Sequence, residues 1–239
     1  MRVGILVPLR DQLPTFDRHA QLRKLRVALE RRIPGARCIM VAVEQQRDDP
    51  KRFNRGALLN LAFALLPQPC DVVIFHDADL IPSDDLAPLY LRLLPRGVVH
   101  HLGARWSRYA KGGGAQYLGG VTAMHPADFA AVDGFPSTFW GWGGEDDALR
   151  VRLEKLGARI ERPDHGSYED LERMSLAAKL DMLRSAGAKC PDKWEQMDEE
   201  RAGRPRPGLR HVPHTVLRRT VSGGAIPLHH VHVQLHAED

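Results

Sequence analysis

The stretch "CDVVIFHDADLIP", residues 70–82, decides the fold. Its apolar run from Val72 to Phe75 has the composition of a strand that is buried on both faces, as strands of parallel sheets are. The run leads directly to Asp77 and Asp79. Because open α/β sheets hold their ligands at the carboxyl ends of the strands, the stretch predicts a central strand with a ligand site at its exit.

The sequence before this strand alternates strand and helix patterns. "RVGILV" (2–7) and "RCIMVAV" (37–43) have strand composition, residues 17–33 place apolar side chains at helical spacing, and residues 54–67 form a nearly all-apolar helix. Strand, helix, strand, helix, strand is typical of a mostly parallel sheet with helices on both faces. We therefore predict an α/β fold.

The pattern after residue 95 is looser. Four segments are predicted from periodicity and glycine content: a strand over 96–105, a flexible loop over 110–116, a glycine-broken strand over 117–125 and a helix over 144–157. Residues 164–210 are polar and loop-rich, with one helix around 174–186. The tail 226–236 alternates, which predicts a closing strand with Val231, Val233 and Leu235 on one side.

Length and composition narrow the function classes. A chain of 239 residues without a low-complexity linker is expected to form one domain. The 34 basic residues are scattered and nearly matched by 30 acids, so the net charge of +4 does not indicate a nucleic-acid partner. The three cysteines have no CxxC spacing, which predicts reduced thiols. With no signal peptide and no apolar run of 18 residues, we expect a soluble, cytoplasmic protein with at most peripheral membrane contact.

Three short motifs suggest chemistry, and each has two open interpretations. Asp77 and Asp79, two positions apart in an extended chain, point to one side and favour a divalent cation between them, or they cap a turn. Arg55 in "FNRG" (53–56) holds a phosphate or is solvated. Gly119 and Gly120 in a strand allow a ligand to approach the backbone or mark a bulge.

The segment "GFPSTFWGWGGEDDALRVRL", residues 134–153, places three acids at a helix start. Acids there are favoured by the helix dipole by about 0.3 to 1 kcal/mol each, so capping alone is one explanation. The other comes from the spacing of Asp146, Leu149, Leu153 and Leu156, which is that of a buried helical stripe. A carboxylate that begins such a stripe beside two tryptophans predicts a pocket floor with a titratable group, and we favour this hypothesis.

Taken together, "VPLR", "FNRG", "HDADLIP", "YLGGVTAM" and "GFPSTFWGWGGEDD" occur in an order and spacing that resembles the β-1,4-galactosyltransferase family. The resemblance covers residues 7–153, with a weaker similarity over 208–235. It implies the GT-A fold, a Rossmann-like nucleotide-sugar transferase fold with a mostly parallel central sheet and helices on both faces. It also implies one domain over 1–239, with a nucleotide-binding half at 1–100 and an acceptor-binding half with C-terminal strands at 101–239.

The resemblance also implies roles for individual residues. Asp146 matches the catalytic base, with Glu145 beside it, and Asp79 matches the direct ligand of Mn²⁺ (or Mg²⁺), with Asp77 as the second DxD acid. Tyr117 matches an aromatic residue that favours galactose. Donor-binding positions are Pro8, Arg10, Phe53, Arg55, Asp77, Ala78, Tyr117, Trp142 and Gly143. Acceptor-binding positions are Trp140, Gly144, Glu145, Asp146 and Asp147.

This sequence departs from the family pattern at two places. Gln12 stands where the family has a second arginine. The family's further metal ligands, a Met/His pair or His-x-His, are missing from "RPDHGSYEDLERMS" (162–175), where His165 is the nearest imidazole. His165 is a metal candidate, although a solvated loop histidine is the favoured interpretation. Otherwise Asp77, Asp79 and water hold the metal, or Glu169 or Asp170 substitutes.

Four histidines near the C-terminus, His229, His230, His232 and His236, raise the alternative of a zinc site. On an alternating strand, one solvated face is the interpretation we favour.

The resemblance predicts an inverting transferase that moves galactose from UDP-galactose to a glycan or glycolipid acceptor, with Asp146 as base and a metal-assisted UDP leaving group. We expect a bacterial-type enzyme without the anchor and stem of Golgi relatives, acting in the synthesis of a capsule, lipopolysaccharide or other polysaccharide. The alternatives are a transferase for UDP-GalNAc or UDP-glucose, a sugar-nucleotide hydrolase, and a non-catalytic module that binds sugar or nucleic acid.

Overall fold

The computed structural model describes residues 1–11, 15–33, 37–106, 108 and 117–237. The loop predicted over 110–116 lies outside the described residues. The strands of the main sheet are β1 (Arg2–Leu9), β2 (Arg37–Gln45), β3 (Val72–His76), β5 (Val98–His101), β6 (Val121–Met124), β7 (Arg159–Glu161), β9 (His214–Ser222) and β10 (Leu228–Leu235). A separate pair is formed by β4 (Leu80–Pro82) and β8 (Tyr168–Asp170).

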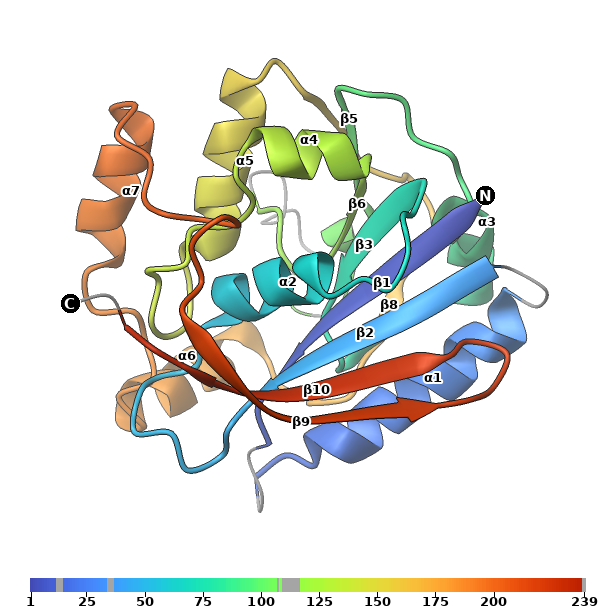
Figure 1. The fold of residues 1–239 in the computed structure, drawn as a ribbon, viewed down its shortest axis with the longest axis horizontal. Coiled ribbons are helices and arrows are strands. Elements are labelled where there is room, and N and C mark those ends of the chain that lie inside the picture. Colours follow the sequence, from blue (N-terminus) through green and yellow to red (C-terminus); the bar gives the residue numbers. More distant parts are fainter. Residues whose placement is uncertain (12–14, 34–36, 107, 109–116, 238–239) are drawn as a thin grey trace.

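The helices lie on both sides of this sheet (Figure 1). They are α1 (Arg18–Arg32), α2 (Arg55–Ala64), α3 (Ala87–Tyr90), α4 (Pro126–Ala131), α5 (Glu145–Lys155), α6 (Leu176–Ser185) and α7 (Lys193–Arg201), with short 3-10 turns η1 (Asp84–Leu86) and η2 (Leu102–Ala104). The helix α7 was not anticipated within the polar region, because its sequence offers little apolar periodicity.

The strand order is β7-β5-β6-β3-β1-β2-β10-β9. The strands β2 and β3 pair with β1 in parallel, as β10 does with β2 and β7 with β5. Antiparallel pairing occurs where β6 joins β3 and β5, and where β9 joins β10. The predicted α/β fold with a mostly parallel sheet is therefore confirmed, and the first, second and third strands of the chain form its centre.

The sheet separates two hydrophobic cores, and the alternation of β3 shows how. Val72 and Ile74 join the core that α1 covers, whereas Val73 and Phe75 join the core that α2, α4 and α5 cover. Full burial of such side chains contributes about 1.5 to 3 kcal/mol each. A strand buried on both faces is what the apolar run in 70–82 predicts.

The predicted buried stripe of α5 is only partly confirmed. In α5, Leu149 and Leu153 are buried as expected, but Leu156 is 45% exposed. The helix ends at Lys155, and Arg152 is buried instead, because its guanidinium pairs with Glu200 of α7.

The three cysteines are free thiols, as predicted, and none of the helices in the described part of the chain is long and apolar enough to cross a bilayer.

Candidate active site

A cavity of about 890 Å³ opens at the carboxyl ends of β1, β2 and β3. Asp79 and Asp146, which the sequence analysis assigned to opposite sides of one reaction, both line it. So do most of the other candidates: Pro8, Arg10, Phe53, Arg55, Asp77, Ala78, Tyr117, Trp142, Gly143, Gly144, Glu145 and Asp147. The volume lies within the range of small-molecule sites.

Two candidates lie elsewhere. Trp140 does not line the cavity: it packs against the core between the sheet and α2, with the Lys51 ammonium 6.0 Å from its ring. Gly141, at a φ of 118°, separates it from Trp142, which is 39% exposed at the cavity. His165 is also outside, where its Nδ1 lies 2.8 Å from the carboxylate of Asp164 on an exposed turn. This geometry does not support the predicted acceptor contact of Trp140, and the exposed position of His165 agrees with the favoured interpretation of a solvated loop histidine instead of a metal ligand.

One side of the cavity is formed by the Arg55 cluster, which we define as Arg55, Asp77, Glu145 and Asp146. Arg55 Nε donates to Asp77 Oδ1 at 2.8 Å, and its Nη1 lies 3.5 Å from Glu145 Oε1. Arg55 Nη1 and Glu145 Oε2 are buried without a hydrogen-bond partner among the described residues. A single guanidinium therefore bridges the DxD turn and the acid helix and retains donor capacity.

The start of α2 fixes this arginine. Asn54 caps the helix by accepting the Ala57 N–H at 2.9 Å, and its Nδ2 donates to the Ser137 carbonyl at 2.7 Å. Gly56 lies so close to the 134–144 segment that a Cβ there would be 2.6 Å from the Pro136 carbonyl oxygen. The cap and the close approach together hold Arg55 against Glu145.

The two acids at the start of α5 have raised pKa values. Burial, followed by repulsion from Asp146, raises the pKa of Glu145 to about 8. Burial, followed by repulsion from Asp147, raises the pKa of Asp146 to about 6. Asp146 Oδ1 also accepts the Asp147 N–H at 2.9 Å, which fixes the carboxylate. A carboxylate with such a pKa is ionised at neutral pH and yet basic enough to take a proton from a substrate.

Gly119 makes room for Asp146. A Cβ at this position would lie 2.3 Å from Asp146 Oδ2 and 2.6 Å from the ring of Tyr117. The glycine pair precedes β6 instead of lying inside a strand, and the groups close to Gly119 are the protein's own Asp146 and Tyr117, so the predicted approach of a ligand to this backbone stays a prediction.

A second part of the cavity wall belongs to the Asp79 cluster, which we define as three acids and three cations: Asp79, Asp170, Glu172, Arg18, Arg108 and Lys179. Lys179 Nζ donates to both Glu172 oxygens at 2.7 and 2.8 Å. Arg18 contacts Glu172 and lies 3.4 Å from Asp79 Oδ2, and Arg108 lies 3.0 Å from Asp170 Oδ2.

The β4–β8 pair assembles this cluster. Leu80 is paired with Asp170, and the Leu171 N–H donates to the Asp79 carbonyl at 2.9 Å. These contacts bring Asp170 and Glu172, which flank Leu171, to Asp79. Glu169 points away, 59% exposed. Of the two carboxylates proposed as substitute ligands, the structure thus brings Asp170 to Asp79 and not Glu169.

The carboxylates of Asp77 and Asp79 belong to two different clusters. The extended geometry assumed for them is wrong, because residues 77–79 form a turn between β3 and β4. Asp77 bonds to Arg55, whereas the carboxylate oxygens that gather within 4.8 Å of one another come from Asp79, Asp170 and Glu172. The metal candidate Asp77 therefore belongs to the Arg55 cluster.

The Asp79 cluster fits a hard divalent cation. Its three acids offer buried carboxylate oxygens only, which is the ligand chemistry that Mn²⁺ and Mg²⁺ prefer. Three acids and three cations cancel, so a bound dication leaves a net positive charge suited to a diphosphate. Glu172 is ready to bind: although burial alone raises its pKa, Arg18, Lys179 and Arg108 hold it at about 2.

Glu172 is the candidate metal ligand that sequence reasoning missed. The signal was the spacing of Asp170 and Glu172, two acids separated by one apolar residue in the segment where the family has metal ligands.

Arg10 lines the cavity, but its guanidinium is engaged with the backbone. It donates to the carbonyls of Arg47, Asp49 and Lys51 at 3.1, 2.5 and 2.6 Å. The residue therefore fixes the loop after β2 against the end of β1, and shapes the cavity wall.

Comparison with known proteins identifies the family of the chain. The family model described as the N-terminal region of glycosyl transferase group 7 matches residues 1–91, and the one described as the N-terminal domain of galactosyltransferase matches residues 101–175. Human β-1,4-galactosyltransferase 4 is 34% identical over 193 residues, which are 73% of this chain and 53% of that protein. The Cricetulus griseus protein of the same name is 43% identical over 125 residues, 49% of this chain and 35% of its own. The chain thus spans about half the length of the curated relatives it matches.

Solved structures show the same fold. The catalytic domain of Drosophila β-1,4-galactosyltransferase 7 in complex with xylobiose superposes with a TM-score of 0.75 at 23% identity, over 99% of this chain and 95% of that one. A mutant of that enzyme, in complex with manganese, UDP-Gal and xylobiose, superposes with a TM-score of 0.73 at 22% identity, again over 99% of this chain and 95% of that one. The GT-A fold that the resemblance implied is confirmed. From the two family models and the 34% identity with its human relative, the chain belongs to the β-1,4-galactosyltransferase family.

Proposed function

We propose that this chain is a UDP-sugar-dependent transferase that moves galactose from UDP-galactose to a sugar hydroxyl with inversion at the anomeric carbon. The observation that supports it most is that one cavity is lined both by Asp146, a half-buried carboxylate with a raised pKa, and by Asp79 and Glu172, two of the three acids of the Asp79 cluster. Family membership and the UDP-Gal complex of a structural relative support the same donor.

Asp146 is the general base in this proposal. Its carboxylate accepts the proton of the acceptor hydroxyl as the hydroxyl oxygen forms a bond to the anomeric carbon, and the bond from that carbon to the UDP oxygen breaks. Direct displacement of this kind inverts the stereochemistry and gives a β-linked product. Asp147 N–H and Gly119 fix the direction in which the carboxylate points.

The leaving diphosphate is neutralised on the other side. Asp79, Asp170 and Glu172 would hold Mn²⁺ or Mg²⁺, which supplies positive charge to the departing UDP when bound. Arg18 and Lys179 line the same cavity and add fixed positive charge there, and Arg55 keeps unused donor capacity between the two clusters.

Three of the aromatic residues that line the cavity suit a nucleotide sugar. Phe53, Tyr117 and Trp142 line it, and the positive φ values of Gly143 and Gly144 beside Trp142 give that segment a backbone path that other residues rarely adopt. We propose that Phe53 contacts the uridine, Tyr117 the galactose and Trp142 the bound sugars. The acceptor, a glycan or glycolipid, and a role in polysaccharide synthesis in the cytoplasm of a bacterium are parts of the same proposal.

The decisive experiment is a mass-spectrometric screen of UDP-galactose, UDP-GalNAc and UDP-glucose against a panel of saccharide acceptors, with Mn²⁺ present. We expect a mass increase of one hexose with UDP-galactose, and a β linkage by NMR. Release of free sugar without transfer would instead indicate a hydrolase, and preference for another donor would overturn the galactose assignment. Binding of saccharides without any turnover would favour a binding module.

A further inference from the structure

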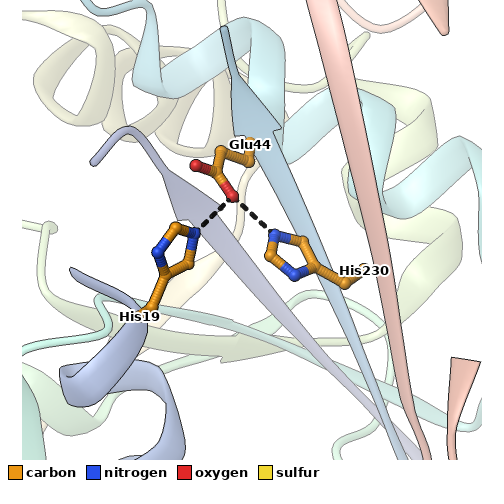
Figure 2. A group of neighbouring side chains, drawn as sticks. All are labelled: His19, Glu44 and His230. Carbon is orange, nitrogen blue, oxygen red and sulfur yellow. Dashed lines mark hydrogen bonds and ion pairs between the residues drawn. The ribbon is translucent and has the colours of Figure 1, made fainter. Parts of the chain in front are cut away.

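Outside the cavity, three histidines surround one buried glutamate. Glu44 lies near the end of β2, His19 in the first turn of α1, and His230 and His232 on β10. Figure 2 shows His19 and His230 approaching Glu44 from opposite sides, with Nε2 of each ring directed at the same carboxylate oxygen. The distances to Glu44 Oε2 are 2.9 Å from His19 Nε2 and 2.7 Å from His230 Nε2.

A third imidazole completes the group. Nδ1 of His232 is 3.5 Å from the same oxygen, and the rings of His230 and His232 stack with centroids 4.4 Å apart. Glu44 is 6% exposed at its side chain, His230 15% and His19 37%, so the group is buried at its base and open at one edge. The interpretation of these C-terminal histidines as one solvated face is therefore wrong for His230 and His232.

The group is separate from the proposed reaction. None of the four side chains lines the cavity, and they come from three elements far apart in the sequence. Two more acids border it, because one ligand atom each of Asp11, Asp17 and His19 lies within 4.8 Å of the others. The surroundings are thus rich in acceptors and favour a cation.

We propose that His19, Glu44 and His230 bind a divalent transition metal of the zinc type, with His232 or water as the fourth ligand. Two imidazole nitrogens and one carboxylate oxygen suit Zn²⁺, whereas the candidate ligands of the Asp79 cluster are carboxylates only and suit Mn²⁺ or Mg²⁺. Ligand atoms about 2.0 to 2.1 Å from a tetrahedral zinc lie about 3.3 Å apart. The observed 2.7 to 3.5 Å brackets that spacing, so small side-chain rotations admit the ion.

Binding would replace two hydrogen bonds by three metal bonds. Each histidine would bind the metal through an unprotonated Nε2: in a neutral ring the proton that Nε2 donates to Glu44 moves to Nδ1, and a protonated ring releases it to solvent. The site would join α1 and β10 to β2. It would also restrain His19, whose neighbour Arg18 contacts Glu172 in the Asp79 cluster.

The test is zinc binding by the full chain after removal of metals with a chelator. Titration against a chromophoric zinc indicator, with excess Mg²⁺ to occupy the Asp79 cluster, should show one tight site. We expect the double variant His19→Ala/His230→Ala to weaken that site at least tenfold. His229→Ala, on the same strand but with the side chain on the opposite face, is the matched control and should keep it.

A result in which the double variant binds zinc as tightly as the wild type would overturn the proposal. If the variant does not fold, the wild type loaded with Co²⁺ decides. Intense visible d–d bands without a sulfur charge-transfer band indicate a tetrahedral N/O site. Weak octahedral bands, or a sulfur band from a cysteine, would contradict the site. Neither readout depends on transferase activity, so failure of the proposed function leaves this test intact.

Discussion

The two sides of the cavity use the same residue types with different charge balance. In the Asp79 cluster, three acids face three cations, and Glu172 is held ionised with a pKa of about 2. In the Arg55 cluster, three acids share one arginine, and the pKa of Glu145 and Asp146 rises to about 8 and about 6. Burial raises the pKa of a carboxyl, and only sufficient positive charge reverses the effect.

This difference suits two tasks. Permanently ionised carboxylates are ligands for a cation and exchange no protons near neutral pH. Carboxyls with raised pKa values exchange protons there, which a general base must do. Burial raises the pKa of Asp79 to about 6. Nearby positive charge offsets this rise only in part, because Arg18 lies 3.4 Å from Asp79 and also pairs with Glu172.

The largest effect is expected for Asp146→Asn, which preserves shape and removes the base. Transfer should fall by about 10³-fold, within the range for loss of a positioned general base, while UDP binding stays within a factor of about two. Steady-state kinetics and calorimetry with UDP measure the two quantities. Glu154→Gln, an exposed residue on the same helix, is the control and should behave as the wild type. Undiminished transfer by the Asp146 variant would show that the Arg55 cluster does not supply the base.

The next effect concerns the position of the base. In Gly119→Ala the new methyl group would meet Asp146 Oδ2 at 2.3 Å, so the carboxylate must move. A displacement of about 1 Å at a catalytic group can cost about 10²-fold in rate, and we expect a loss of that size in kcat. Gly223→Ala, where nothing lies within 4 Å of the new atom, serves as the control. Equal kcat values for the two variants would mean that Gly119 has no positioning role.

The sequence predicts the central sheet well, because the apolar runs of β1, β2 and β3 are buried on both faces and have no other plausible place. It also groups most cavity residues correctly, since strand ends and helix starts meet at one edge. Trp140 was misplaced because the turn at Gly141 separates it from Trp142, which motif spacing does not reveal. Glu172 was missed because its approach to Asp79 depends on the β4–β8 pair, a contact between segments about 90 residues apart.

A smaller effect is expected on metal binding, which is assigned to the Asp79 cluster alone. In Glu172→Gln the Asp79 cluster loses an ionised ligand, and we expect Mn²⁺ affinity to fall about 10- to 100-fold, measured by calorimetry in the presence of UDP. Glu169→Gln, three residues earlier and exposed, should leave the affinity unchanged. The thermal midpoint of each apo variant reports separately on the buried pairs with Lys179 and Arg18. If both variants bind Mn²⁺ equally well, Glu172 is not a ligand.

The pH dependence of transfer should report the raised pKa of Asp146. Saturating Mn²⁺ removes the titration of Asp79, so the acid limb of kcat/KM should report Asp146. Because its pKa is raised to about 6, the base is ionised above that pH, and the rate should fall about tenfold per unit below it. Asp147→Asn removes the repulsion that contributes to the raised pKa, so the limb should shift to lower pH. A limb that stays at its wild-type position in this variant would contradict the assigned cause.

The last expected effect is on stability, and its sign follows from Glu145. Its pKa is raised from the ordinary 4.5 to about 8 in the folded state, so the folded protein holds a proton that the unfolded chain releases. The stability that this proton contributes is complete below about pH 4.5, declines as the pH rises, and is lost above about 8. Glu145→Gln resembles the protonated acid at every pH. Urea unfolding should therefore show that the free energy of unfolding of the variant rises relative to that of the wild type by a few kcal/mol between pH 5 and pH 8. A constant difference over that range would mean that Arg55 compensates Glu145 fully, and the two clusters would then not differ in charge balance.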